Sequence, residues 1–526
     1  MGITVLRGKY MNMGNKVNDL RARKQNASLG GGQTKIERQK EKGKQTARER
    51  ILGLYDQGSF VEIDAFVETR SIDFDMQNRK VMGDGVVTGY GRINGRLVFS
   101  STQDYTVMHG SMGEMHAKKI SKMLDMAVKM GAPVVFINDS DGARLEEGVD
   151  VLAGFGDIFQ KTATASGVIP MISVILGTCA GGAVYAPALT DFIIMCDKTS
   201  HMYMTGPSVI EAVTGEKTNA DDLGGSHTQT EKTGNAHLRY AGENECLLGL
   251  KKLLSYLPDN NLSASPVVNG TDDVNRAVAE IYDMIPEDPK MPYDIRNIVT
   301  AVVDAGSFME IQPDFAKNMI TGLARIGGNS VGIVANNPQF LDGNLDVDAS
   351  DKAARFVLFL DSFNIPILTF TDVQGYAIGV KQETMGIVRH GAKLIYAFTE
   401  ASVPKINVIV GKAFGGAYIA MNSKHLGADV VYAFPTAQIA VMGTEGAADI
   451  IYAKDIAKSE DPINFRKDKI DEYRNRFASP YEAAKKGYVD DVIDPAFTRA
   501  YIAVALDMLK SKRETRPNKK HGNMPL

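Results

Sequence analysis

Cysteine is scarce in this chain: only Cys179, Cys196 and Cys246 occur among 526 residues. They have neither the spacing of metal ligands nor the pattern of a disulfide framework. We therefore expect buried or free thiols, no metal site, and a reducing compartment such as the cytoplasm.

A strong net charge is also missing. The 63 acidic side chains nearly balance 59 lysines and arginines, which leaves −4. This balance gives no reason to expect nucleic acid or an anionic membrane as a partner. The first 24 residues carry basic side chains but no long apolar segment, so no signal peptide is expected.

No uninterrupted membrane-spanning segment stands out. Residues 168–190 carry no charged side chain, and that length matches the ~20 residues needed to cross a bilayer. However, the segment contains Pro170, Gly177 and Pro187, and its counterpart later in the chain contains Lys405 and Lys412. Two buried strands flanking a helix of small residues explain it better than a membrane span.

Familiar catalytic motifs are absent as well. No glycine-rich loop ends in Gly-Lys-Ser/Thr, and none has the dinucleotide-binding fingerprint. No Gly-x-Ser-x-Gly elbow follows a predicted strand, and no His-Glu-x-x-His occurs. His390 and His425 lie near the later glycine turns, where we expect structural hydrogen bonds from them.

Four glutamates remain as candidate general acids or bases. Each could equally be a helix N-terminal charge or a surface group, so no side chain stands out as catalytic. They are Glu146, Glu147, Glu383 and Glu445.

The chain instead repeats itself. Three segments recur in the same order and at similar separations: 56–63 as 304–311, 88–95 as 321–328, and 179–185 as 413–418. A length of 526 residues exceeds the roughly 250–300 at which a single core stops growing. We therefore predict two copies of one domain, residues 1–262 and 266–526, joined by a linker around residues 260–266.

Short apolar runs with helical patterns between them predict an α/β fold. The runs are continuous rather than alternating, as in strands that are covered on both faces. They are residues 134–138, 171–176, 192–196 and 201–204, then 367–371, 406–410, 430–434 and 439–442. Helices are expected at 115–130, 351–361 and 465–481, and the basic tail 510–520 is either solvated or a contact for a ligand phosphate.

Each copy has two glycine-containing turns after strands. These turns are residues 138–144 and 177–183 in the first copy, and 371–380 and 411–417 in the second. Glycine allows close backbone approach and positive φ, and a helix that begins there leaves its first amides unpaired. Two such amides can converge on one oxygen as an oxyanion hole, for example on an enolising thioester. Close helix–sheet packing is the alternative for any single turn, but the repeated pair favours a site built from backbone amides.

Residues 141–144 (Asp-Gly-Ala-Arg) and 180–183 (Ala-Gly-Gly-Ala) resemble the crotonase superfamily. The resemblance implies two tandem crotonase-like (ClpP/crotonase superfold) β-β-α domains. The duplication narrows it to biotin-dependent acyl-CoA carboxyltransferases, such as the propionyl-CoA carboxylase β subunit, the methylmalonyl-CoA decarboxylase α subunit and the large transcarboxylase subunit. The resemblance covers residues 43–523, and its most specific stretches are 389–393 and 440–443.

The resemblance also implies two substrate sites. The first domain would bind acyl-CoA, with the amides of Ala143 and Gly182 on the thioester oxygen. The second would bind biotin, with amides at Val380, Gly416 and Ala417 on the ureido oxygen. Neighbouring substrate contacts would be Gly142, Gly181 and Gly206 on the acyl-CoA side, and Gly379, Gly415 and Ile419 on the biotin side.

By this resemblance, the enzyme supplies two oxyanion holes and proximity, and biotin takes the α-proton of the acyl-CoA. The chain has neither an Ala-Met-Lys-Met biotinylation pattern nor an ATP-grasp signature. It would therefore need a separate biotin carrier, plus a biotin carboxylase, a membrane decarboxylase or a keto-acid carboxyltransferase subunit. A cytoplasmic homohexamer is expected, at most peripheral to a membrane complex, that acts on propionyl-CoA or methylmalonyl-CoA.

Two departures from the family pattern bear on this interpretation. Gln374 replaces the usual proline before the biotin-side turn, which leaves the position of Val380 less fixed. Ile419 replaces the acidic residue common in propionyl-CoA carboxylases and favours a decarboxylase or transcarboxylase. The alternatives are an ATP-dependent carboxylase subunit, a crotonase-type hydratase or isomerase, and a non-catalytic scaffold that docks the carrier.

Overall fold

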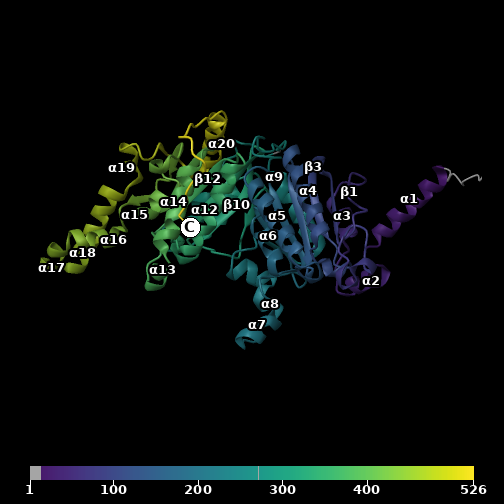
Figure 1. Ribbon diagram of the computed structural model, residues 1–526. Coiled ribbons are helices and arrows are strands. Elements are labelled where there is room, and N and C mark those ends of the chain that lie inside the picture. Colours follow the sequence, from purple (N-terminus) through teal and green to yellow (C-terminus); the bar gives the residue numbers. More distant parts are fainter. Residues whose placement is uncertain (1–12, 271, 526) are drawn as a thin grey trace, which may run out of the picture. The chain divides into compact units, whose positions relative to one another are not determined.

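The computed structural model describes residues 13–270 and 272–525 (Figure 1). The first twelve residues, part of the segment in which no signal peptide was expected, lie outside this range. The described chain forms two compact units: residues up to Gln229 with Arg239–Lys251, and Thr230–Leu238 with Lys252 onward. The segment Thr230–Leu238 therefore belongs to the second unit, although it precedes the predicted linker.

The first unit is built on a mixed sheet with the strand order β1-β2-β3-β4-β5-β6-β8, and β7 pairs with β5. Pairing is antiparallel from β1 to β3 and parallel from β3 to β6. The strands are β1 Val61–Ile63, β2 Val86–Ile93, β3 Arg96–Gln103, β4 Val134–Ser140, β5 Met171–Ala180, β6 Phe192–Cys196, β7 His201–Tyr203 and β8 Leu238–Tyr240. The four strands predicted here are confirmed.

The helices of the first unit are α1 Met13–Ser28, α2 Gln33–Glu41, α3 Ala47–Leu54, α4 Glu114–Met130, α5 Val149–Ala165, α6 Tyr185–Ala188, α7 Pro207–Thr214, α8 Ala220–Gly224 and α9 Glu243–Tyr256, which continues into the second unit from Lys252. Helix α4 confirms its prediction, since Ile120, Met123 and Leu124 are buried. It ends at Gly131, whose φ of 59° is the left-handed conformation typical of a helix C-terminus.

The uncharged segment 168–190 forms β5, the short helix η4 (Gly181–Val184) and α6. Throughout residues 13–270 and 272–525, every helix is too short or too polar to span a bilayer. All three cysteines are buried.

The second unit repeats this topology. Its strand order is β16-β14-β13-β12-β11-β10-β9, and β15 pairs with β13 as β7 pairs with β5. The strands are β9 Met309–Ile311, β10 Met319–Ile326, β11 Asn329–Asn336, β12 Ile367–Val373, β13 Lys405–Phe414, β14 Val430–Ala433, β15 Gln438–Ala440 and β16 Asp491–Val492. The four strands predicted in this copy are also confirmed.

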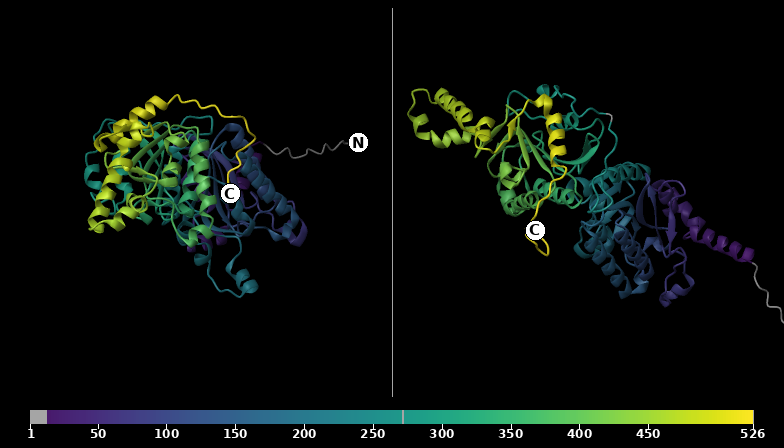
Figure 2. Two further views of the ribbon diagram at one scale, coloured as in Figure 1. Left: turned by 90° about the vertical axis from the view of Figure 1, so that its left-hand side faces the viewer. Right: turned by 90° about the horizontal axis from the view of Figure 1, so that it is seen from above.

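The helices of this unit are α10 Ile281–Met284, α11 Ile295–Val302, α12 Val347–Ser362, α13 Val380–Thr384, α14 Ile387–Glu400, α15 Gly415–Ala420, α16 Thr444–Ile451, α17 Ala453–Lys458, α18 Pro462–Tyr473, α19 Pro480–Lys485 and α20 Thr498–Leu509. Apolar residues of α11 and α20 pack with β10–β14 in one buried core that includes Ile298, Phe370 and Ile502. Helices α16–α18 extend away from the sheet of this unit (Figure 2).

The single helix predicted at 465–481 is wrong. Helix α18 begins at Pro462, after the cap residue Asp461, and ends at Tyr473. A π-helical turn follows, and α19 starts at Pro480. Because a residue before proline is disfavoured in the α conformation, Ser479 is extended and separates the two helices.

Two of the predicted turns begin later than expected, because β5 and β13 continue through Gly177 and Gly411. The register jumps at these glycines. On β4, Asn138 and Ser140 face Ile175 and Cys179 of β5, and the second unit repeats this jump between β12 and β13. Extra residues therefore bulge from β5 and β13, and beyond the bulge these strands pair with β7 and β15.

Candidate active site

The first turn of the N-terminal unit directs one amide away from its neighbours. Met112 donates its N–H to the Gly142 carbonyl oxygen at 2.8 Å, and Arg144 donates to the Met112 carbonyl oxygen at 2.9 Å. The residue between them, Ala143, forms a parallel bridge with Met112, so its own N–H points to the opposite side. Among the described residues, this N–H has no hydrogen-bond acceptor.

The two turns of this unit touch each other. Gly142 has a φ of 103°, and a Cβ at this position would lie 2.8 Å from the Ala180 carbonyl oxygen. Ala180 directly precedes η4, which starts at Gly181 with a φ of 64°. Gly182 lies in the first turn of η4, so its N–H has no acceptor within the helix. The predicted residues Gly142, Ala143, Gly181 and Gly182 are thus brought together.

Gly206 follows the strand that pairs with the end of β5. Strand β7 pairs with the end of β5, where Tyr203 faces Ala180, and Gly206 then caps α7 three residues later. A Cβ on Gly206 would lie 3.6 Å from the Tyr203 ring, an ordinary contact. The structure therefore places all five residues that the sequence predicts for the acyl-CoA side beyond the carboxyl ends of β4, β5 and β7.

Buried charges anchor the first turn. The Arg144 guanidinium is 1% exposed and binds Asp84 at 2.7 Å and Glu147 at 2.8 Å. Although burial opposes it, hydrogen bonds from the Glu114 amide, Thr69 and Arg144 lower the pKa of Glu147. Glu147 is therefore an anionic anchor of the turn.

The second unit contains the same backbone arrangement. Leu345 donates its N–H to the Gly375 carbonyl oxygen at 3.0 Å, and Ala377 donates to the Leu345 carbonyl oxygen at 2.8 Å. The bridged residue between them is Tyr376, which corresponds to Ala143. Its N–H also lacks an acceptor among the described residues. The register thus identifies Tyr376, rather than Val380, as the counterpart of Ala143.

The Tyr376 ring lies against two glycines. A Cβ on Gly391 of α14 would be 2.8 Å from the ring, and a Cβ on Gly416 of α15 would be 3.7 Å from it. Burial raises the pKa of Tyr376 to about 12. Helix α15 starts at Gly415, with a φ of 59°, so the amides of Gly416 and Ala417 lie in its first turn without intrahelical acceptors.

Of the other residues that the sequence predicts for the biotin side, Gly379 and Val380 lie at the start of α13 and Ile419 lies in α15. Gly379 has a φ of 144°, and Val380 begins α13 with 81% of its surface exposed. Ile419 of α15 is 40% exposed, and Ile378 and Val441 are exposed as well. The side chain nearest to Gly416 is therefore Tyr376. The turn that carries the unpaired Tyr376 amide has exposed apolar side chains around it.

Gly182 and Gly416 have no packing reason to be glycine. A methyl group on Gly182 would meet the Phe155 ring at 3.8 Å, and one on Gly416 would meet Tyr376 at 3.7 Å; both are ordinary contact distances. Close helix–sheet packing, the alternative left open by the sequence, therefore does not explain these two glycines. Both positions leave space beside an unpaired amide.

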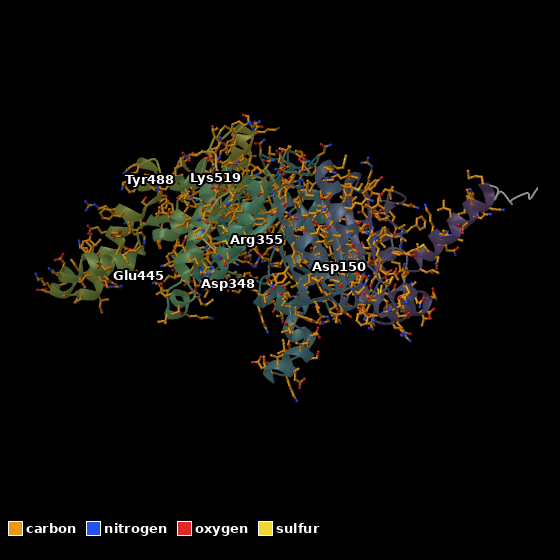
Figure 3. All side chains as sticks on the ribbon, viewed as in Figure 1. Asp150, Asp348, Arg355, Glu445, Tyr488 and Lys519 are labelled. Carbon is orange, nitrogen blue, oxygen red and sulfur yellow. The ribbon has the colours of Figure 1, made fainter. Side chains whose placement is uncertain are left out.

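The histidines and the tail have structural partners. His390 bonds Asp351 at 2.8 Å, which confirms its hydrogen-bonding role. His425 instead packs edge-to-face against Tyr418 and Tyr488. The basic tail 510–520 is mostly exposed to solvent, and two of its lysines form ion pairs: Lys512 binds Asp429 at 2.8 Å and Lys519 (Figure 3) binds Glu400.

The other candidate carboxylates are placed on surfaces. Glu445, in the first turn of α16 (Figure 3), pairs with Lys290 at 2.7 Å. Glu146 pairs with Arg79 at 3.0 Å, and Glu383 is exposed on α13. Their positions match the helix-terminal and surface roles left open by the sequence.

Two buried aspartates beneath the turns are not predicted from the sequence. Asp139 binds Lys44 at 2.6 Å and Arg50 at 2.9 Å, and Asp372 accepts a 2.7 Å bond from the Tyr293 hydroxyl. The available signal was an aspartate at the same point of both repeats, directly after an apolar strand.

Comparison with known proteins agrees with this architecture. Residues 38–524 match the carboxyl transferase domain model. The chain is 52% identical to the methylmalonyl-CoA decarboxylase subunit alpha of Propionigenium modestum, over 97% of this chain and 99% of that protein. It is 52% identical to the propionyl-CoA carboxylase carboxyltransferase subunit of Haloferax mediterranei, over 98% and 100%.

A solved structure is similar over the full length. The transcarboxylase 12S crystal structure, a hexamer with hydrolysed methylmalonyl-coenzyme A bound, superposes with a TM-score of 0.96 at 50% identity, over 99% of this chain and 100% of that one. The two predicted crotonase-like α/β domains are confirmed by this match. The chain therefore belongs to the family of biotin-dependent acyl-CoA carboxyltransferases.

Proposed function

We propose that this chain moves a carboxyl group between biotin, carried on a separate protein, and a short acyl-CoA, with methylmalonyl-CoA and propionyl-CoA as the pair. The observation that carries the proposal is the duplicated turn: in each unit an unpaired amide lies beside a glycine that packing does not require. The names of the relatives supply the acyl-CoA class.

The first unit would hold the acyl-CoA. The amides of Ala143 and Gly182 would donate to the thioester oxygen, with Gly142, Gly181 and Gly206 lining the approach. Charge develops on this oxygen when the bond to the α-carboxyl group breaks, and preorganised donors stabilise it. We also propose that residues 1–262 bind the acyl-CoA and that residues 266–526 bind biotin.

The second unit has features that fit biotin. The amides of Gly416 and Ala417 would bind the ureido oxygen, with a further donor at Tyr376 by the internal symmetry, or at Val380 by the family pattern. Exposed apolar side chains, including Ile378, border the turn and suit an apolar bicyclic ring. When bound, biotin supplies the nitrogen that accepts or delivers the carboxyl group.

A hydratase-type mechanism is less well supported. It would need a carboxylate free to act near the acyl β-carbon. Glu147 is 4% exposed and committed to Arg144, and Glu146 is paired with Arg79. Both glutamates therefore serve the turn or its surroundings.

We further propose a cytoplasmic homohexamer that works with a biotin carrier in a decarboxylase or transcarboxylase complex. Ile419, in place of the acidic residue of many propionyl-CoA carboxylases, supports this choice. Affinity purification of the native complex, followed by mass spectrometry, would distinguish the partners. A membrane decarboxylase subunit would indicate a decarboxylase, a keto-acid carboxyltransferase a transcarboxylase, and an ATP-grasp subunit would overturn this choice.

The function itself is tested by mixing purified chain with methylmalonyl-CoA and free biotin and measuring propionyl-CoA by chromatography. The carboxyl group leaves the α-carbon for a biotin nitrogen, and the proton of that nitrogen replaces it. We expect propionyl-CoA to form in proportion to enzyme and only when biotin is present. Formation without biotin, or none at all, would contradict the proposal.

A further inference from the structure

Each strand bulge beneath the glycine turns is filled by one buried aspartate. We infer that Asp139 and Asp372 are positioning residues: each clamps the bulge of the neighbouring strand and so sets the direction in which that strand presents its turn amides. The inference rests on the proposed function, because it assigns one aspartate to each substrate site.

Glycine in the bulge is required by these carboxylates. A Cβ on Gly177 would lie 1.9 Å from an Asp139 carboxylate oxygen, and one on Gly411 would lie 2.3 Å from an Asp372 oxygen. Both distances are far below any real contact. Each aspartate faces the residues that its neighbouring strand has in excess, and a bulge redirects the strand that follows it.

The clamp in the first unit is ionic. The Asp139 carboxylate accepts from Lys44 at 2.6 Å and from Arg50 at 2.9 Å, and its side chain is fully buried. Arg50 also bonds Glu243 and, at 3.2 Å, the carbonyl oxygen of Leu176 in the bulge. The Arg50 guanidinium thus holds both the Asp139 carboxylate and the backbone of the bulge. Gly181, where η4 begins, lies only five residues after Leu176.

The clamp in the second unit uses uncharged donors. One Asp372 oxygen accepts from the Tyr293 hydroxyl at 2.7 Å, and the other accepts from the Lys412 backbone N–H at 2.9 Å. Burial raises the pKa of Asp372. Lys412 is the bulge residue next to Gly411, and Gly415 begins α15 three residues later. A single hydroxyl therefore supports the aspartate that fixes this bulge.

The difference between the clamps allows each site to be perturbed separately. Tyr293→Phe removes one hydrogen bond to Asp372 and leaves the Asp139 cluster untouched. Lys44→Met removes one bond to Asp139 and leaves Asp372 untouched. Loosening a bulge displaces the amides that follow it, and such a displacement weakens oxyanion stabilisation.

The test measures kcat/KM separately for biotin and for methylmalonyl-CoA in the free-biotin assay, using the full-length protein. For Tyr293→Phe we expect kcat/KM for biotin to fall at least tenfold, while the KM for methylmalonyl-CoA changes less than twofold. Lys44→Met should mainly lower kcat/KM for methylmalonyl-CoA, through a higher KM or a lower kcat. Matched controls are Tyr282→Phe, which removes an exposed hydroxyl bond to Asp494, and Lys122→Met, which removes an exposed pair with Asp64.

The outcomes separate the two proposals. A wild-type protein that makes no propionyl-CoA contradicts the function itself. The positioning role is overturned if the wild type is active and Tyr293→Phe has the same kinetic constants as Tyr282→Phe. It is also overturned if Tyr293→Phe changes the kinetic constants for biotin and for methylmalonyl-CoA to the same extent. If Tyr293→Phe fails to fold, Asp372→Asn, which keeps the side-chain shape and one acceptor oxygen, must show the same biotin-selective loss for the inference to stand.

Discussion

At the scale of single residues, glycine has different physical roles at neighbouring positions. Gly142 lets two backbones approach, since a Cβ would meet the Ala180 oxygen at 2.8 Å, whereas Gly177 makes room for the Asp139 carboxylate. Gly182 does neither, because an added methyl group would only touch Phe155 at 3.8 Å. The proposed function assigns the space beside Gly182 to a ligand, and substitution can test this assignment.

Replacing Gly182 with proline should abolish one oxyanion donor, because proline has no N–H. We expect the rate of propionyl-CoA formation to fall by roughly 10²–10³, the usual cost of losing such a donor. Gly182→Ala is the matched control, since it adds a methyl group at ordinary contact distance and keeps the amide. An equal loss in both variants would show that space, and not the N–H, is what matters.

A second residue-scale feature is a buried lysine in α12. The Lys352 ammonium donates to the carbonyl oxygens of Gln312, Phe315 and Met319 at 2.6–2.8 Å, and Lys119 of α4 holds the Gly83 carbonyl in the same manner. Burial lowers the pKa of Lys352 to about 7.

Because the folded-state pKa of Lys352 is depressed below its unfolded value of about 10.4, the unfolded state binds more protons between these values. Its contribution to stability is therefore greatest above pH ~10.4 and is lost as the pH falls toward 7. We expect this residue to raise the free energy of unfolding of the wild type by up to about 1.4 kcal/mol for each pH unit that the pH rises between these two pKa values. Urea unfolding at several pH values should show a smaller slope for Lys352→Met and an unchanged slope for the exposed Lys485→Met.

At the scale of elements, local chemistry decides where helices begin. Helix α3 has a complete capping box: the Thr46 side chain accepts from the Glu49 N–H, and the Glu49 side chain accepts from the Thr46 N–H. This helix carries Arg50, which is 0% exposed, so its start also fixes the ionic clamp around Asp139.

Thr46→Ala should destabilise the protein by about 1 kcal/mol, the typical value for a lost N-cap. The measurement is the urea midpoint of unfolding. Thr164→Ala, on the exposed face of α5, removes a threonine without a capping role and should change stability by less than about 0.5 kcal/mol. Equal effects of the two changes would argue against the capping box.

The bulges provide the second test at this scale. Gly177→Ala would force the new methyl group and the Asp139 carboxylate apart inside the sheet, which should cost about 1–3 kcal/mol. In α5, nothing lies within 4 Å of a Cβ on Gly156, so Gly156→Ala should stabilise by about 0.5–1 kcal/mol. Opposite shifts of the unfolding midpoint are expected, and a neutral Gly177→Ala would contradict the tight fit around Asp139.

At the scale of the whole molecule, the two units repeat one topology with different chemistry at equivalent points. Ala143 corresponds to Tyr376 by register, and a cluster of charges around Asp139 corresponds to a tyrosine hydroxyl at Asp372. Such divergence after duplication suits two substrates of different shape that must react with each other.

The assembly is the prediction that belongs to this scale. The transcarboxylase relative is a hexamer, and we expect a particle with six times the 57.1 kDa mass of the chain. Light scattering coupled to gel filtration, over a hundredfold range of concentration, measures this mass. A monomer at every concentration would contradict the proposed hexamer.

The sequence by itself determined the duplication, the α/β class, the strands that carry the turns and the family, because these depend on local patterns and on recurrence along the chain. Only the tertiary structure decided which residues correspond across the copies and what each glycine is for. Tyr376 was missed because its equivalence to Ala143 depends on a bridge to Leu345, far away in sequence. Asp139 was missed because the significance of a buried carboxylate depends on the side chains that surround it, here Lys44 and Arg50, and no local pattern encodes those contacts.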